Sequence, residues 1–239
     1  MLTPRNWRLE TVARLLLAMT TAWLLAAALA LGLSAAWKER GGHFPPIAML
    51  AITGLGFHGV GLVLIARFLR WENRDWRGAF GLGRNTGAAL RYSFGWTCLA
   101  GPAVYGLHQF AALELERLGW PPSAQDSVQL LVRSGWLDRG VIALFAVVLA
   151  PVVEELLFRG ILFPALRDAG WPRVAMGVAS FGFGLIHGNA TAFLPLSALG
   201  GYLAWLYLRT GNLLAPILAH FLFNLVPFIL IAAGVDFGK

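Results

Sequence analysis

The hydrophobic positions of this chain form long runs, separated by shorter stretches that are rich in arginine. A helix that crosses a bilayer needs about 20 consecutive, mostly apolar residues. Seven runs come close to this length, and they cover residues 15–37, 46–69, 92–113, 140–167, 174–189, 193–208 and 213–233. This pattern predicts an all-α fold, a polytopic membrane helical bundle with about seven transmembrane helices. We expect residues 1–239 to form a single membrane domain, because no linker or internal repeat divides the chain.

The stretches between the runs also carry information. Residues 67–91 contain six arginines, and we expect them to form a loop at the level of the lipid headgroups. Residues 114–139 are polar, and Ser123–Asp126 is a plausible helix start. A short interfacial or re-entrant helix is therefore predicted after this start.

The second predicted span is rich in glycine, which favours close contact with other helices. Its glycines are Gly54, Gly56, Gly59 and Gly61. His58 lies among them, and we expect it to make a hydrogen bond between helices rather than to act in catalysis. His108, in the third span, is expected to be structural as well.

Composition and charge agree with a membrane protein and indicate its orientation. Hydrophobic residues make up 58% of the chain and charged residues 13%, whereas soluble domains carry about 25% charged residues. The net charge of +7 does not indicate nucleic-acid binding, because the basic residues lie between apolar runs. Thirteen of them fall on the amino-terminal side of the predicted bundle and six on the other. The positive-inside rule then places the amino terminus in the cytoplasm, in what we expect to be a bacterial cytoplasmic membrane.

Two adjacent carboxylates, Glu154 and Glu155, interrupt the fourth apolar run. A charged group at bilayer depth is costly, so it usually faces the protein interior and serves a function. Successive residues of a helix point about 100° apart, so the two side chains cannot share a direction. Glu155 and Arg159 are spaced i,i+4 and can form an ion pair on one face. Glu154 is then left without a helical partner.

Other polar residues are predicted at a similar depth. Glu154 is counted back from Arg167 and His187 is counted on from Arg173, the arginines at the cytoplasmic ends of their spans. At 1.5 Å per helical residue, both side chains lie roughly 20 Å from the cytoplasmic boundary. His220 lies at about 16 Å on the same count, and Asn224 is one turn further on the same helical face. We therefore predict a polar intramembrane cavity in which these four side chains meet.

The chemistry of these residues suits hydrolysis of an amide bond. A desolvated carboxylate such as Glu154 can act as a general base on water, with help from His187. His220 and Asn224 carry donors that could hold an oxyanion. A Ser/His/Asp set is not evident, and the zinc-protease pattern His-Glu-x-x-His is absent. The alternative is that these groups only tie the helices together.

Three short motifs carry a resemblance to a known family. They are Glu154–Arg159 (EELLFR), Phe183–His187 (FGLIH) and His220–Asn224 (HFLFN). In order and spacing they resemble the CPBP family of intramembrane proteases, also called the CAAX prenyl protease type II or Abi family. The resemblance makes residues 140–233 a CPBP-like catalytic core. Residues 1–139 add helices without a motif that we can place.

The resemblance implies an intramembrane endopeptidase with a defined division of roles. By position, Glu154 and His187 would activate water, while His220 and Asn224 would stabilise the oxyanion. The supporting residues would be Glu155, Arg159 and Phe183. Both metal-dependent and glutamate-type mechanisms are described for the family. Two histidines and a carboxylate could bind Zn²⁺, but Asn224 is a poor metal ligand, so we favour a site without a metal or other cofactor.

Several alternatives stay open at this stage. The resemblance implies a peptide or protein substrate, with CAAX-type prenylated proteins as one class and membrane lipid as the surroundings. A non-catalytic membrane scaffold or a bacteriocin self-immunity protein is the second hypothesis. A transporter is the third, since acids near the bilayer midplane also serve as proton relays, but no repeated, broken helices support it. Nucleic acid is not expected as a partner, and the oligomeric state is left open.

Overall fold

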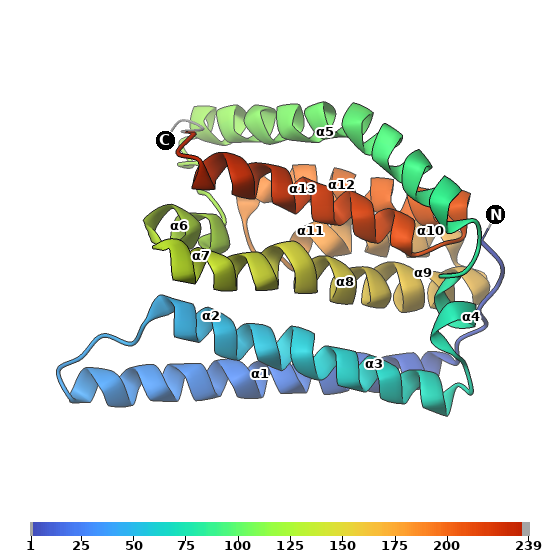
Figure 1. Cartoon of the computed structure of the whole chain (residues 1–239), viewed down its shortest axis with the longest axis horizontal. Helices are drawn as coiled ribbons and strands as arrows, with labels where there is room; N and C mark the ends of the chain where they lie inside the picture. The colour runs from blue at the N-terminus through green and yellow to red at the C-terminus, as the bar shows by residue number, and fades with distance from the viewer. Residues whose placement is uncertain (1, 236–239) are drawn as a thin grey trace.

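A computed structural model describes residues 2–235, and helices dominate this part of the chain (Figure 1). The α-helices are α1 (Leu9–Glu39), α2 (Pro46–Gly54), α3 (Val60–Trp71), α4 (Trp76–Phe80), α5 (Thr86–Arg117), α6 (Asp126–Arg133), α7 (Trp136–Ile142), α8 (Ala150–Glu155), α9 (Phe163–Asp168), α10 (Pro172–Gly177), α11 (Phe183–Leu185), α12 (Ala190–Thr210) and α13 (Leu214–Ala232). Four π-helical turns join some of them into longer helices: η1 (Leu55–Gly59), η2 (Ala143–Leu149), η3 (Leu156–Leu162) and η4 (Val178–Gly182).

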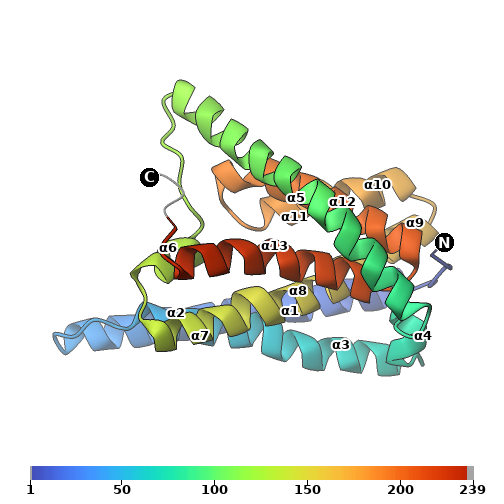
Figure 2. The same cartoon turned by 45° about the horizontal axis from the view of Figure 1, so that its top comes forward.

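The long helices α1, α2–α3, α7–α9 and α13 have roughly parallel axes, whereas α5 crosses them (Figure 1). The first long helix, α1, lies beside α2–α3, and the α7–α8–α9 helix lies between this pair and α13 (Figure 1). Helix α5 packs on α12 and α13 and crosses them obliquely (Figure 2). The predicted all-α bundle is therefore confirmed. The α7–α9 helix, which carries the adjacent glutamates, runs through its middle.

In the part of the chain that the structure describes, five helices are long and apolar enough to cross a membrane. They are Leu9–Glu39, Pro46–Trp71, Trp136–Asp168, Ala190–Thr210 and Leu214–Ala232. The other two predicted spans fall on helices outside this group: residues 92–113 lie within α5, and residues 174–189 lie mostly in the helix Pro172–Leu185, which ends early. The count of seven spans thus remains a prediction.

The polar segments between the long apolar helices contain short helices. Helix α6 begins at Asp126, as predicted from the helix start at Ser123–Asp126. The basic stretch 67–91, predicted as a loop, contains the short helix α4, and the Asp75 carboxylate caps it by accepting a hydrogen bond of 2.9 Å from Gly78 N–H. This bond to the ionised form lowers the pKa of Asp75.

Residues before α1 anchor one end of the bundle. The Arg5 backbone N–H donates to Asp168 Oδ2 over 2.6 Å, and its guanidinium donates to the carbonyl of Gly78 over 2.8 Å. The Trp7 indole N–H donates to the Gly160 carbonyl over 3.0 Å. These contacts join the amino-terminal segment, the basic connection and the α7–α9 helix at the end where the N-terminus lies in Figure 1.

Two π-turns end next to a proline, which leaves a backbone carbonyl without its helical donor. In η2, Ala150 N–H donates to Phe145, five residues back, so the next donor in that register would be Pro151, which has no N–H. The Ala146 carbonyl therefore needs a donor from outside the helix. Gly160 in η3 lies four residues before Pro164, which cannot donate to it in the α-helical register, and the Trp7 indole N–H donates to its carbonyl instead.

Glycines allow α2–η1–α3 to approach the α7–α9 helix closely, as the sequence predicted. A Cβ atom at Gly54 would lie 2.6 Å from the Phe145 ring, and one at Gly61 would lie 3.4 Å from Val153. Both neighbours belong to the α7–α9 helix, and Val153 directly precedes Glu154. The amino-terminal helices therefore pack against the segment that carries the two glutamates.

We predict that Gly200→Ala destabilises the protein. A Cβ at Gly200 would lie 2.5 Å from the carbonyl oxygen of Ala179, a backbone atom that cannot move aside easily. Overpacking of this kind costs about 1–3 kcal/mol, so thermal unfolding in detergent should begin at a lower temperature. Gly95→Ala is the matched control, since nothing lies within 4 Å of its added Cβ. Equal melting temperatures for the two variants would contradict this packing.

Candidate active site

The adjacent glutamates have different surroundings, as the sequence predicted for Glu155. Arg159 Nη1 donates to Glu155 Oε1 over 2.9 Å, and both side chains are fully buried. An ion pair taken out of water is tolerable only when further hydrogen bonds satisfy its members. Arg159 has such bonds: its Nη2 donates to the carbonyls of Gly200 (2.9 Å) and Ala179 (3.3 Å). The pair therefore connects the α8–η3 segment with η4 and α12.

Phe183 packs directly on this pair. The Arg159 guanidinium carbon lies 4.4 Å from the centroid of the Phe183 ring, within the range of a cation–π interaction. The ring is fully buried and also contacts two histidines edge-on, with centroid distances of 5.0 Å to His187 and 5.5 Å to His220. Phe183 thus contacts both imidazoles as well as the guanidinium.

His220 is oriented by Glu155. Its Nδ1 lies 3.0 Å from Glu155 Oε1, which also accepts the bond from Arg159. Because a carboxylate paired with a guanidinium can only accept, Nδ1 carries the hydrogen, and Nε2 is the free ring nitrogen. That Nε2 lies 4.0 Å from Glu154 Oε2.

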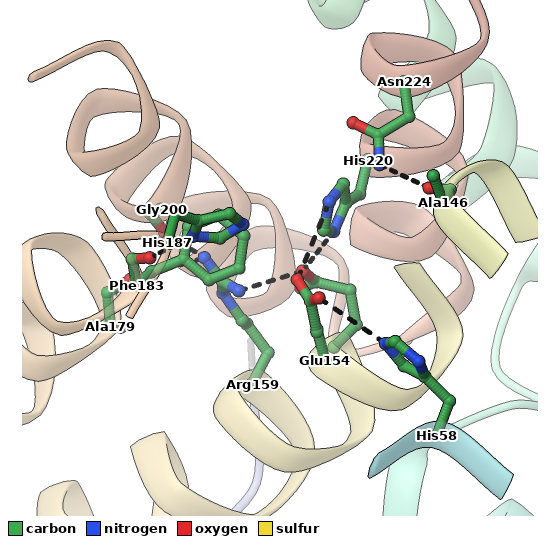
Figure 3. A network of polar contacts seen from close by, with 11 residues as sticks. His58, Ala146, Glu154, Arg159, Ala179, Phe183, His187, Gly200, His220 and Asn224 are labelled. Carbon is green, nitrogen blue, oxygen red and sulfur yellow. Dashed lines mark hydrogen bonds and ion pairs between the residues drawn. The ribbon is translucent and has the colours of Figure 1, made fainter. Parts of the chain in front are cut away.

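Glu154 has no arginine or lysine partner and lies between two imidazoles (Figure 3). His220 faces one carboxylate oxygen, and His58 Nε2 lies 3.9 Å from the other. The residue is only 9% exposed, and in residues 2–235 its Oε2 makes no hydrogen bond. A buried carboxylate with a free oxygen and basic nitrogens within 4 Å is well placed to exchange a proton.

His187 joins the site less directly. Its Nδ1 lies 2.7 Å from the Phe183 carbonyl, so Nδ1 carries the hydrogen and Nε2 is again free. It follows the end of α11 and is half-buried, and within the described part of the chain no hydrogen bond or ion pair joins it to Glu154. It contacts the site through the Phe183 ring, so the structure brings His220 close to Glu154 and places His187 one ring away.

Asn224 supplies the donor that the Ala146 carbonyl lacks. Its Nδ2 donates to this carbonyl over 2.8 Å (Figure 3). Asn224 lies one turn beyond His220 on α13, as predicted from their i,i+4 spacing. One of the two amide hydrogens is therefore used to link α13 to η2, and the second is free for another acceptor.

A pocket opens at His187. Its volume is about 210 Å³, and it is lined by Gln125, Asp126, Ser127, His187, Gly188 and Asn189. Asn189 Nδ2 donates to the Ser123 carbonyl over 3.1 Å, which ties the segment before α6 to the segment after α11. A polar cavity around Glu154 itself remains a prediction.

The side chains do not present a metal-binding arrangement. Among residues 2–235, no group of three or more His, Cys, Asp or Glu side chains has the geometry to hold a metal ion. The imidazole nitrogens closest to Glu154 are 3.9 and 4.0 Å from its oxygens, and the Asn224 amide nitrogen is directed to a carbonyl. These positions do not fit a zinc site as they stand.

His58 is the site residue that the sequence reasoning did not select. We expected it to make an interhelical hydrogen bond, but its Nδ1 bonds the Gly54 carbonyl of its own helix over 3.2 Å, and its Nε2 faces Glu154. The available signal was a histidine in a glycine-rich helix, which indicates close packing but does not name the neighbour.

Comparison with known proteins agrees with this geometry. Residues 136–226 match the family model described as "Type II CAAX prenyl endopeptidase Rce1-like". This segment contains all three motifs, from Glu154 to Asn224, while His58 lies outside it.

Two curated proteins are similar to part of the chain. A Bacillus subtilis (strain 168) protein named "Putative membrane peptidase YdiL" is 35% identical over 77 residues, which cover 32% of this chain and 32% of that protein. The human protein "CAAX prenyl protease 2" is 31% identical over 113 aligned positions, which cover 37% of this chain and 33% of that protein. The similarity thus spans about a third of the length of each relative. No solved structure matches significantly. Residues 136–226 of this integral membrane protein are thus similar to the Rce1-like type II CAAX prenyl endopeptidase (CPBP) family.

Proposed function

We propose that this chain is an intramembrane endopeptidase in which Glu154 activates a water molecule. The observation that carries the proposal is the environment of Glu154: a buried carboxylate without a cationic mate, facing two imidazole nitrogens at 3.9 and 4.0 Å. The neighbouring Glu155 has the opposite environment, because its carboxylate accepts hydrogen bonds from Arg159 and His220. One glutamate is thus free to react while the other holds the site together.

The reaction that we propose needs no covalent intermediate. Glu154 accepts a proton from water as the water oxygen attacks the carbonyl carbon of the scissile peptide bond. The resulting tetrahedral intermediate collapses with cleavage of the C–N bond, and Glu154 returns the proton to the departing amine nitrogen. His220, oriented by Glu155, presents its Nε2 to the same carboxylate and would help to hold the water.

The developing oxyanion needs hydrogen-bond donors. Asn224 has one amide hydrogen that is not used by Ala146, and it lies one turn from His220 on α13. We propose that this hydrogen stabilises the oxyanion, together with His220 Nε2 when the ring is an imidazolium and this nitrogen also carries a hydrogen. Glu155, Arg159 and Phe183 would act as supports, because they fix His220 rather than contact the reacting bond.

His187 and the pocket beside it are the proposed approach for the peptide. The pocket of about 210 Å³ reaches His187, whose free Nε2 would then meet the substrate on the opposite side of Phe183 from His220. We propose a membrane-associated peptide or protein as substrate. The name of the human relative makes a prenylated carboxyl-terminal peptide the first one to test.

We predict that Glu154→Gln abolishes cleavage while the protein still folds. The amide has nearly the same shape but cannot accept the proton from water, and loss of a general base typically costs about 10²–10⁴-fold in rate. Comparative proteomics of membranes from cells with the wild type or the variant measures this, since uncut substrates should accumulate. Glu10→Gln is the matched control, because Glu10 pairs only with exposed Arg14. A variant with wild-type processing would contradict the proposal and favour a non-catalytic scaffold or immunity protein.

We predict that the Glu155–Arg159 pair acts through structure rather than chemistry. Arg159→Met should destabilise the protein by about 3–5 kcal/mol, since it leaves Glu155 buried and uncompensated. The double variant Glu155→Gln/Arg159→Met removes both charges and should melt at a higher temperature than the single variant. Thermal unfolding of the purified proteins measures the difference. Independent, additive losses from the two substitutions would show that the pair is not coupled.

We predict that purified, active protein contains no stoichiometric zinc and that cleavage survives a zinc chelator. The reason is geometric, since the described side chains do not form a three-ligand group. Elemental analysis beside a cleavage assay provides the measurement. Stoichiometric zinc that is present in the wild type and lost in His220→Ala would contradict the hypothesis that Glu154 activates water without a metal.

A further inference from the structure

His58 approaches Glu154 from outside the family-matched segment. Its Nε2 lies 3.9 Å from Glu154 Oε1, the two side chains are 14% and 12% exposed, and in residues 2–235 that Nε2 has no hydrogen-bond partner. An unpartnered, buried imidazole nitrogen is costly unless a partner is close. Within the described residues, Glu154 is the only acidic residue whose carboxylate lies within ion-pair distance of His58.

The hydrogen on the His58 ring can be located from its other contact. Nδ1 lies 3.2 Å from the Gly54 carbonyl, which can only accept, so Nδ1 carries a hydrogen. Nε2 is directed to the carboxyl group, and the two attract each other when one of them carries a proton, as in the imidazolium form of His58. His220 has the same arrangement, with Nδ1 donating to Glu155 and Nε2 directed to the other oxygen of Glu154. The carboxylate therefore lies between two imidazoles of equivalent orientation (Figure 3).

The backbone around His58 is built for this approach. His58 lies in the π-turn η1, and turns of this type occur frequently at functional sites. Gly54, one turn before His58, lacks the side chain that would hold the helix away from Phe145, since a Cβ there would lie 2.6 Å from the ring. A purely structural histidine would not need its Nε2 aimed at Glu154, which among the buried glutamates of residues 2–235 is the one without an arginine or lysine partner.

We propose that His58 is a positioning residue for Glu154, which fixes the carboxylate on the side opposite His220. The inference rests on the proposed function, since it assigns His58 a role in the same reaction. It also gives the helices before residue 136 a part in the site: α2, η1 and α3 bring an imidazole to a carboxylate that belongs to the family core.

The first test uses full-length protein labelled with ¹⁵N-histidine in lipid nanodiscs. The chain has five histidines, so single His→Asn variants can assign their ring resonances. We expect Glu154→Gln to shift the Nε2 resonances of His58 and His220 and to leave that of His108 unchanged. An unchanged His58 resonance overturns the contact, whether or not the protein is a peptidase.

The second test compares two substitutions that keep different nitrogens of the ring. His58→Asn retains a donor for the Gly54 carbonyl but removes the nitrogen that faces Glu154, whereas His58→Gln places an amide nitrogen near the Nε2 position. We expect His58→Asn to slow processing of the membrane proteins that accumulate with Glu154→Gln, on the order of 10- to 100-fold, as when an outer partner of a reactive group is lost. His58→Gln should retain most of the rate, with both variants melting at the same temperature, and His108→Asn should match the wild type.

The outcomes separate the two proposals. Wild-type processing by His58→Asn, with Glu154→Gln inactive, overturns the role of His58 and leaves the peptidase intact. If Glu154→Gln changes no membrane protein, the peptidase proposal fails, and the ¹⁵N shift alone then supports or overturns the His58–Glu154 contact. Equal losses in His58→Asn and His58→Gln would also overturn the positioning role, because the retained nitrogen would have had no effect.

Discussion

The buried guanidinium of Arg159 is the contact on which the arrangement of this protein depends. It binds Glu155 one turn away, and it also binds carbonyls of Ala179 and Gly200 in two other helical segments. Through Glu155 the same network reaches His220 on α13. In an apolar interior these bonds have no competition from water, so their loss would leave several polar groups unsatisfied at once. The network therefore holds the His220 ring in position and uses Glu155 for hydrogen bonds to Arg159 and His220. Of the two adjacent glutamates, Glu154 is then the one whose carboxylate can react.

The π-turns contribute to the site in a related way. A π-turn beside a proline leaves a backbone carbonyl without a donor from its own helix, and a side chain from another segment then donates to it. The Asn224 amide donates to the carbonyl of Ala146, and the Trp7 indole donates to that of Gly160. Each such bond links a distant part of the chain to the helix that carries Glu154. One amide hydrogen of Asn224 is used in this bond, so the side chain has one amide hydrogen left to donate to a substrate.

The sequence predicted the parts of this structure that depend on spacing within one helix. The Glu155–Arg159 pair, the shared face of His220 and Asn224, and the contact of Phe183 with His187 all follow from i,i+4 geometry. Contacts between helices were harder to predict, because they depend on how each helix is rotated toward its neighbour. The bond from His220 to Glu155 and the approach of His58 to Glu154 are of this kind. Depth counting also predicted His187 beside Glu154; its helix ends at Leu185, and within residues 2–235 no hydrogen bond or ion pair joins the two side chains, so this part stays a prediction.

The most direct test of the account is an experimental structure of the protein in lipid nanodiscs, at a resolution that defines side chains. The account predicts that Arg159 pairs with Glu155, while the Glu154 carboxylate points inward between the Nε2 atoms of His58 and His220, near the separations of 3.9 and 4.0 Å seen here. A Glu154 side chain that pairs with Arg159, or that points outward to the lipid chains, would contradict it.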